Sequence, residues 1–148
     1  MMSNYTINQT QGNSSDDGGL VFINHVTYAL YLFSFFTAGL TWLIAIIINY
    51  VKRGEAQGTW LESHFDWQIN TFWYVIIMGV IATVVIFLGL PTGFAALVTN
   101  DAASSFSLLS LSGLLVLAGG LFWFFIVCWH LYRIIRGWLA LASKKSVP

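Results

Sequence analysis

Residues 69–90 read INTFWYVIIMGVIATVVIFLGL, and none of these side chains carries a charge. A helix needs about 20 consecutive apolar residues to cross the hydrocarbon core of a bilayer. The stretch is long enough for that, and it lies within an uncharged window that extends from residue 67 to residue 100. It therefore predicts a transmembrane helix at the centre of the chain.

Two further windows, residues 18–51 and 102–132, are also uncharged, and the three together hold 99 of the 148 residues. Charged residues make up 8% of the chain, against about 25% in soluble domains, and the mean hydropathy is +0.75. Too few polar side chains are available to cover a water-soluble fold, so that class is excluded. The net charge of zero also argues against nucleic acid as a partner, because that partner needs a cationic face.

We expect an all-α membrane protein with three transmembrane helices at about residues 26–51, 69–90 and 106–132. Pro91 and Gly93 are expected to end the second span. The apolar residues 94–98 that follow are too few to cross again, so they form either an interfacial turn or a kinked extension. The third span continues into an amphipathic segment, RIIRGWLALASKK (133–145).

The basic residues all follow the first or the third expected span; they are Lys52, Arg53, Arg133, Arg136, Lys144 and Lys145. Because cytoplasmic loops are enriched in Lys and Arg, this distribution predicts an N-terminus outside and a C-terminus inside. Under that topology His25 lies at the outer face, whereas His64 and His130 lie near the cytoplasmic face. The three histidines could then not share a metal ion.

Three regions follow from the composition. Residues 1–24 are rich in Asn, Ser, Thr, Gln and Gly and are expected to be a disordered tail outside the membrane. Residues 25–138 are expected to form a single helical membrane domain, and residues 139–148 a basic cytoplasmic tail. No basic segment precedes the first apolar window, so we expect this window to be retained and not cleaved as a signal.

The linker GTWLESHFDWQINTFW (58–73) has the T-x-x-E spacing of a capping box at Thr59 and Glu62, which predicts a helix start at Thr59. We expect an amphipathic cytoplasmic helix over about 59–68 that lies at the membrane surface and bends into the second span. Its predicted flanks are apolar (Leu61, Phe65, Ile69, Phe72), acidic and polar (Glu62, Asp66, Asn70), and mixed (Trp60, His64, Trp67, Thr71). The mixed flank suits lipid headgroups or a partner protein.

Glu62 and Asp66 lie one helical turn apart at the depth of Arg133 and Arg136, so ion pairs between the two sets are expected. In an alternative interpretation the carboxylates and His64 form an acid/base or metal site. A haem held by His64 and His130 is a further alternative. The residues singled out for interaction or structure are Trp60, Glu62, His64, Phe65, Asp66, Trp67, Arg133 and Arg136.

Small and weakly polar residues follow one face of the first expected span, at Ser34, Ala38, Thr41, Ala45 and Asn49, and the third span has Ser112 and Gly119 seven residues apart. Such stripes let helices approach closely, so we expect helix or subunit packing along them. A solute path is the alternative. Asp, Glu, Lys and Arg are absent from mid-span, which argues against proton-coupled transport.

The segments SFFTAGLTWLIAIIINYVKR (34–53) and GTWLESHFDWQINTFW resemble a family of small bacterial inner-membrane proteins of unknown function. That family is distantly similar to the channel-forming component of the chloroplast inner-envelope import translocon. The resemblance covers about residues 25–138, and its most specific part is Asn49-Tyr50 plus basic residues, followed by Trp60, Ser63, His64 and Phe65 in W-x-x-S-H-F. It implies a location in the bacterial cytoplasmic (inner) membrane and a compact helical hairpin assembly with a surface helix. Chloroplast relatives have four spans, and the family has no assigned activity.

The chain has no nucleophile elbow, P-loop, dinucleotide fingerprint or zincin motif, so we expect no catalysis, cofactor or metal. We expect a multi-pass protein that works by association, as an accessory subunit of a larger membrane complex or as a homo-oligomer. Its partners would be membrane lipids and other integral membrane proteins or further copies. The alternative is a channel or protein-translocation-like component with a path between protomers. An enzyme acting on lipids through Glu62, His64 and Asp66 is a third interpretation.

Overall fold

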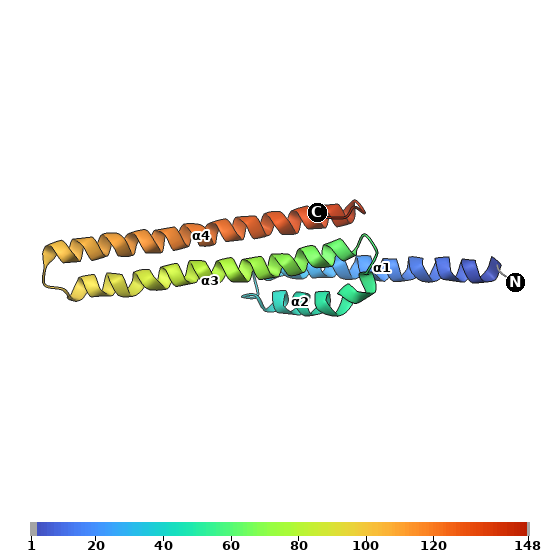
Figure 1. The fold of residues 1–148 in the computed structure, drawn as a ribbon, viewed down its shortest axis with the longest axis horizontal. Coiled ribbons are helices and arrows are strands. Elements are labelled where there is room, and N and C mark those ends of the chain that lie inside the picture. The colour runs from blue at the N-terminus through green and yellow to red at the C-terminus, as the bar shows by residue number, and fades with distance from the viewer. Residues whose placement is uncertain (1–2, 148) are drawn as a thin grey trace. The chain divides into compact units, whose positions relative to one another are not determined.

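The computed structural model describes the backbone of residues 3–147 and the side chains of residues 18–147. Within these residues the regular elements are all helical (Figure 1), which confirms the expected all-α class. They are α1 (Ser3–Phe33), α2 (Leu40–Lys52), a short 3-10 helix (Arg53–Ala56), α3 (Glu62–Val98) and α4 (Ala102–Ala142).

The chain divides into two compact units. Unit 1 consists of Met1–Phe72 and Leu131–Pro148, and unit 2 of Trp73–His130. Both α3 and α4 contribute residues to each unit.

Unit 2 is an antiparallel hairpin of α3 and α4 in which small residues allow close approach. A Cβ atom added to Gly119 would lie 2.5 Å from Ile86 Cγ1 and 3.1 Å from the carbonyl oxygen of Ala82. The hydroxyl of Ser112 donates to the carbonyl of Gly89 at 2.8 Å. Ser112 and Gly119, the two positions that the sequence analysis singled out on the third span, thus contact α3 within the same chain.

The helix α3 continues through Pro91 to Val98, so the expected end of the second span at this proline is wrong. Pro91 removes one backbone N–H donor, and the neighbouring Thr92 hydroxyl donates to the carbonyl of Leu88 at 2.8 Å. Of the two alternatives for residues 94–98, the interfacial turn is wrong and the segment extends the helix.

Asp101 caps the start of α4. Its carboxylate accepts the backbone N–H of Ser104 at 2.8 Å. Hydrogen bonds from Ser104 lower the pKa of this exposed carboxyl, so the cap is ionised at neutral pH. The link between the two helices of unit 2 therefore carries a fixed negative charge.

Two helices of the described residues, α3 and α4, are long and apolar enough to cross a membrane. The single span expected over residues 26–51 is wrong, because the chain turns between Phe33 and Leu40 and forms two shorter helices. Ala38 and Gly39 adopt positive φ values of 50° and 88° in this turn, which an α-helix cannot contain. The apolar part of α1, Gly18–Phe33, is a shorter helix than a span requires.

Unit 1 packs α1 and α2 against the first turns of α3 and the last turns of α4. Its largest fully buried apolar side chains include Tyr28, Tyr31, Phe65 and Ile134, each 2% exposed or less. The expected surface helix over residues 59–68 is wrong as a separate element, since the segment from Glu62 onward is the start of α3. Its predicted apolar flank is buried: Leu61, Phe65, Ile69 and Phe72 are at most 8% exposed.

Both expected tails contribute to unit 1. Leu20 and Asn24 of α1 are 5% and 0% exposed and pack in the core. The disorder expected over residues 1–24 is therefore wrong for residues 18–24. The side chains before residue 18 lie outside the described ones. In the predicted basic tail, residues 139–148, α4 continues to Ala142. Beyond it, the N–H of Val147 donates to the Ser63 hydroxyl at 3.1 Å.

Candidate functional site

Buried polar side chains gather in the interior of unit 1. Asn24, Thr27, Asn49, His64, Gln68 and Thr71 are each 2% exposed or less. Polar groups in such an interior need hydrogen-bond partners, because an unpaired one costs about 1–3 kcal/mol. Their pairing accordingly fixes how the helices of this unit assemble.

Three amides form a relay from α1 through α3 to α2. Asn24 donates to the carbonyl of Leu20 at 3.2 Å, Gln68 donates to Asn24 Oδ1 at 3.1 Å, and Asn49 donates to Gln68 Oε1 at 3.1 Å. Because the Leu20 carbonyl can only accept, the orientation of each amide along the relay is determined. Gln68 thus ties Asn24 and Asn49 to the same level of α3.

His64 links α3 to α1 and to the C-terminal segment. Its Nε2 lies 2.9 Å from the carbonyl oxygen of Lys145, which can only accept, so Nε2 carries the proton. Its Nδ1 then accepts the hydroxyl proton of Tyr28 at 3.1 Å. This arrangement uses the neutral imidazole.

Burial favours the same protonation states. Burial lowers the pKa of His64, which lies ahead of the uncharged stretch of α3. The hydrogen bond to the Lys145 carbonyl raises this pKa in part, and the nearby His25 lowers it further. Burial also raises the pKa of the Tyr28 phenol, which stays a donor. Both side chains are at most 1% exposed, so they have no access to a substrate from solvent.

Trp67, Thr71 and Arg133 join α3 to α4. The guanidinium carbon of Arg133 lies 3.6 Å from the centre of the Trp67 ring, and Arg133 Nε donates to the Thr71 hydroxyl at 2.7 Å. The indole N–H of Trp67 donates to the carbonyl of Arg133 at 3.1 Å. The contact is a cation–π pair supported by hydrogen bonds.

The expected ion pairs of Glu62 and Asp66 with Arg133 and Arg136 are wrong. Asp66 pairs with Arg53 at 2.5 Å and raises the pKa of that guanidinium, while Glu62 accepts the backbone N–H of Gly58 at 2.9 Å. Arg136 instead donates to the Tyr132 hydroxyl at 3.0 Å. The acidic flank of α3 faces the segment after α2, whereas the neighbouring flank with Trp67 faces α4.

The mixed flank of the linker does not face lipid headgroups or a partner as expected. His64, Trp67 and Thr71 are 0%, 8% and 2% exposed, and Trp60 is half-buried. Two segments supply the cover: Tyr28 of α1 contacts His64, and Arg133 of α4 contacts Trp67 and Thr71. Phe65 belongs to the same core.

The expectation that His25 and His64 lie at opposite membrane faces is also wrong, because both are in unit 1 and affect each other electrostatically. Trp138 donates its indole N–H to His25 Nδ1 at 2.8 Å. Among the side chains that the structure describes, no three His, Cys, Asp or Glu residues are grouped to hold a metal ion.

The stripe predicted on the first span does not follow one helix. Ser34 and Ala38 lie in the turn, and Thr41, Ala45 and Asn49 lie on α2. Ala45 and Asn49 are fully buried in unit 1, whereas Ala38 is exposed. Ala45 and Asn49 thus pack within the chain, and the five positions do not form one continuous helical stripe.

Sequence reasoning missed Asn24 and Gln68. Each is an amide at the edge of an apolar window, and an amide at such a position needs a partner if it is buried. A recess beside Gln68 is too narrow to hold a water molecule; it is lined by Tyr28, Tyr31, Trp67, Gln68, Thr71, Arg133 and Ile134. The polar interior is therefore closed and acts as a structural core.

No protein family model, no curated protein and no solved structure matches this chain.

Proposed function

We propose that this protein is a multi-pass component of the bacterial cytoplasmic membrane that works by association, as a subunit of a larger membrane complex or as a homo-oligomer. It has no catalytic activity of its own. One observation carries the proposal: Gly113 and Gly120 are exposed on unit 2, and a Cβ added to either would meet no atom within 4 Å.

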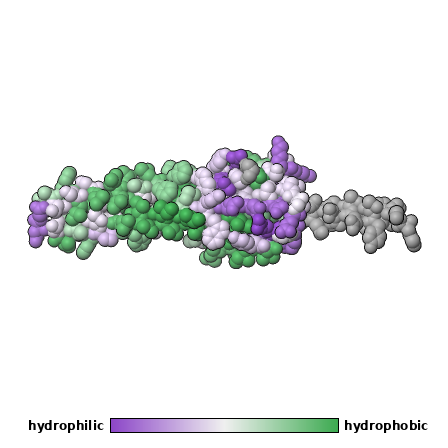
Figure 2. All heavy atoms as spheres, viewed as in Figure 1, coloured by the Kyte–Doolittle hydropathy of each residue, from purple (hydrophilic) through white to green (hydrophobic). Residues whose placement is uncertain are grey.

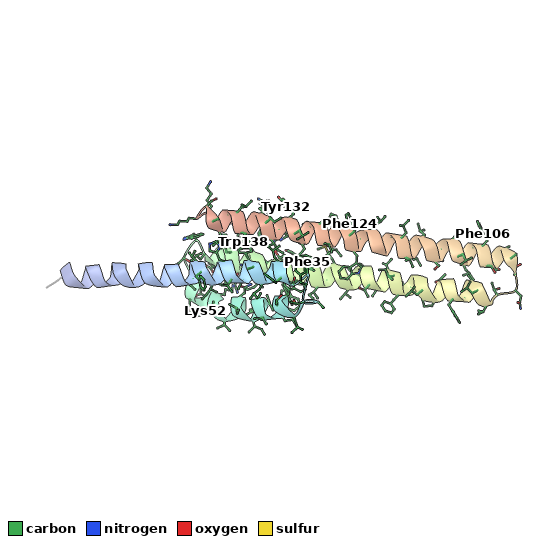
Figure 3. The ribbon with its side chains drawn as sticks, turned by 180° about the vertical axis from the view of Figure 1, so that it is seen from behind. Phe35, Lys52, Phe106, Phe124, Tyr132 and Trp138 are labelled. Carbon is green, nitrogen blue, oxygen red and sulfur yellow. The ribbon has the colours of Figure 1, made fainter. Side chains whose placement is uncertain are left out.

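On the face that Figure 2 shows, most of the surface of unit 2 is apolar. Only 17% of the most apolar stretch of α3 and 11% of that of α4 are buried. Exposed large side chains of α4 include Phe106 and Phe124, 75% and 68% exposed (Figure 3). Lipid or the helices of another membrane protein can cover such a surface, whereas water cannot.

The glycines of unit 2 fall into two groups. Gly79, Gly89, Gly93 and Gly119 all have side-chain or backbone atoms of the other helix within 3.2 Å of where a Cβ would lie, so the hairpin itself requires them. A Cβ added to Gly113 or Gly120 would have no such atom within 4 Å. Their spacing of two helical turns places them on one face of α4 together with Leu117 and Phe124.

Glycine is the least favourable residue in a helix apart from proline, by about 1 kcal/mol relative to alanine, and here it gains no contact within the chain. A small-residue notch flanked by large apolar side chains lets the backbone of a second helix approach closely. Association through this face of α4 explains both features together.

The charge distribution supports an orientation in which the basic segments of unit 1 face the cytoplasm. Asp101 is the one charged residue of unit 2, and all six basic residues belong to unit 1. The basic segments therefore face the cytoplasm by the positive-inside rule. The closed polar core supports a role without catalysis, because His64 and Tyr28 cannot reach a substrate.

The test is the size of the protein purified from native membranes in mild detergent. Wild type is expected to elute as a homo-oligomer or with a stoichiometric partner, and Gly113→Leu with Gly120→Leu to elute as a monomer. Ala118→Leu is the matched control, since Ala118 is exposed on a different face of α4. A monomeric wild type without a partner contradicts the proposal, as does equal loss of association in the control.

A further inference from the structure

The α1–α2 hairpin has features that indicate how it lies in the membrane, and these features are independent of the association proposed for unit 2. At 1.5 Å per residue, the apolar part of α1, Gly18–Phe33, is about 24 Å long and α2 is about 20 Å long. Both are shorter than a hydrocarbon core of about 30 Å. Neither helix alone is a transmembrane span.

The first residues of the hairpin, in α1, and its last residues, in α2, lie at the same level, which is the base of the hairpin. Asn24 of α1 and Asn49 of α2 both bind the side chain of Gln68, near the base of the hairpin. Near the tip, the Thr41 hydroxyl of α2 donates to the carbonyl of Leu30 of α1 at 2.9 Å. Figure 3 labels Phe35 at the tip and Lys52 at the base. The chain thus returns to the level from which it came.

Several backbone groups in and beside the turn at the tip are hydrogen-bonded within the hairpin. The Ser34 hydroxyl donates to the carbonyl of Tyr31 at 2.6 Å, and the Thr37 hydroxyl donates to the carbonyl of Phe33 at 3.3 Å. The N–H of Gly39 donates to the carbonyl of Ser34 at 3.0 Å. In hydrocarbon each unsatisfied backbone group costs several kcal/mol, so non-helical backbone is tolerated there only when it is paired in this way.

The surface around this paired turn is apolar. Phe33, Phe36 and Leu40 are 62%, 88% and 66% exposed at the tip. The outer face of α2 continues this surface with Leu43, Ile44, Ile47 and Val51, each 48% exposed or more. Figure 2 has the same view as Figure 1 and shows a hydrophobic (green) surface where α2 lies.

Charged groups appear only at the base. Lys52 pairs with Glu55 at 2.7 Å, and Arg53 pairs with Asp66. An apolar tip with exposed phenylalanines and a charged base is the pattern of a segment that inserts into a membrane from one side. The tip hydroxyls are directed to carbonyls of the hairpin itself, so the tip presents apolar side chains outward, as a surface in contact with acyl chains requires.

We propose that α1 and α2 form a re-entrant hairpin, which enters the acyl chains of one leaflet and leaves on the face from which it entered. Lipid acyl chains cover Phe36 and the outer face of α2. The segment before residue 18 then lies on the same side as residues 53–61, which reverses the N-out orientation expected from three spans.

The experiment uses Cys128→Ser full-length protein with single cysteines at exposed positions: Gly19→Cys, Gln57→Cys and Asn100→Cys. An impermeant maleimide is added to intact cells and to permeabilised cells. Cysteines at positions 19 and 57 are expected to be labelled only after permeabilisation, and the one at position 100 in intact cells. Labelling of position 19 in intact cells together with position 100 overturns the proposal, because residues 26–51 would then cross.

A second measurement identifies the occupant. Phe36→Cys in the same background is labelled with bimane in proteoliposomes, and lipids carrying a nitroxide on the acyl chain are added. Strong quenching is expected, with Gln57→Cys as the unquenched control. Absence of quenching at position 36 overturns the proposal, because the tip would then be covered by protein or exposed to water. Neither readout depends on oligomeric state, so association can fail while the hairpin holds.

Discussion

The phenol of Tyr28 and Nδ1 of His64 lie 3.1 Å apart in the interior of unit 1, while Nε2 of the same ring donates to the Lys145 carbonyl. Three segments separated by 36 and 81 residues in sequence thus meet at one imidazole.

Removing the Tyr28 hydroxyl tests this junction. Tyr28→Phe leaves His64 Nδ1 buried without a donor, so we expect a loss of about 1–3 kcal/mol in unfolding free energy. The measurement is denaturant unfolding in detergent micelles, followed by tryptophan fluorescence. Tyr132→Phe, which removes a hydroxyl from a 55% exposed ring, serves as the control and should cost much less. Equal effects of the two changes would argue against the junction.

The junction also predicts a pH dependence. Because burial lowers the pKa of His64 below its usual 6.5, the unfolded chain binds more protons than the folded chain as the pH falls through that value. The contribution of His64 is therefore present above pH 6.5 and declines below it. The unfolding free energy measured between pH 7.5 and about pH 5 should fall more in wild type than in His64→Gln. Identical profiles would contradict the neutral, buried imidazole.

The hydroxyl of Thr41 is expected to stabilise the tip of the α1–α2 hairpin. It donates to the Leu30 carbonyl at 2.9 Å and lies 3.0 Å from the Thr37 hydroxyl. Thr41→Val conserves shape but removes the donor, so we expect a loss of about 1 kcal/mol or more in unfolding free energy. Thr41→Ser keeps the hydroxyl and should retain most of the stability. If serine and valine are equally destabilising, the hydrogen bond is not the cause.

Two adjacent glycines of α4 should respond oppositely to the same change. Gly119→Ala places a methyl group 2.5 Å from Ile86, which forces the hairpin of unit 2 apart and is expected to cost about 1–3 kcal/mol in unfolding free energy. Gly120→Ala enters open space and should be neutral or stabilising in a monomer. Denaturant titration of both variants in detergent measures the contrast. If Gly120→Ala is destabilising and Gly119→Ala is neutral, then α4 is rotated about its own axis and Gly120, not Gly119, faces α3.

The sequence predicted the helical class and the apolar character of α3 and α4, because both depend on long uncharged windows that no local feature interrupts. The break between α1 and α2 could not be predicted from hydropathy, since Phe33–Leu40 is as apolar as its surroundings and only Gly39 marks the turn. This error led to another: with a single span, His25 and His64 were predicted to lie at opposite faces of the membrane.

The ion pairs failed for a related reason. Helical spacing correctly put Glu62 and Asp66 on one flank, but it could not determine which neighbour that flank faces. Arg133 binds Trp67 and Thr71 on the next flank instead. The roles of Asn24 and Gln68 depend on each other across 44 residues, a pairing that a single sequence does not reveal.

Cross-linking in native membranes is the most direct test of association through one face of α4. In the Cys128→Ser background, Leu117→Cys places a thiol between Gly113 and Gly120, and Leu111→Cys places one on a different face that is also exposed. With a short bifunctional or oxidising reagent, we expect a discrete covalent adduct, to a second copy or to one partner, at position 117 and none at position 111. Equal cross-linking at the two positions, or none at either, would contradict association through this face.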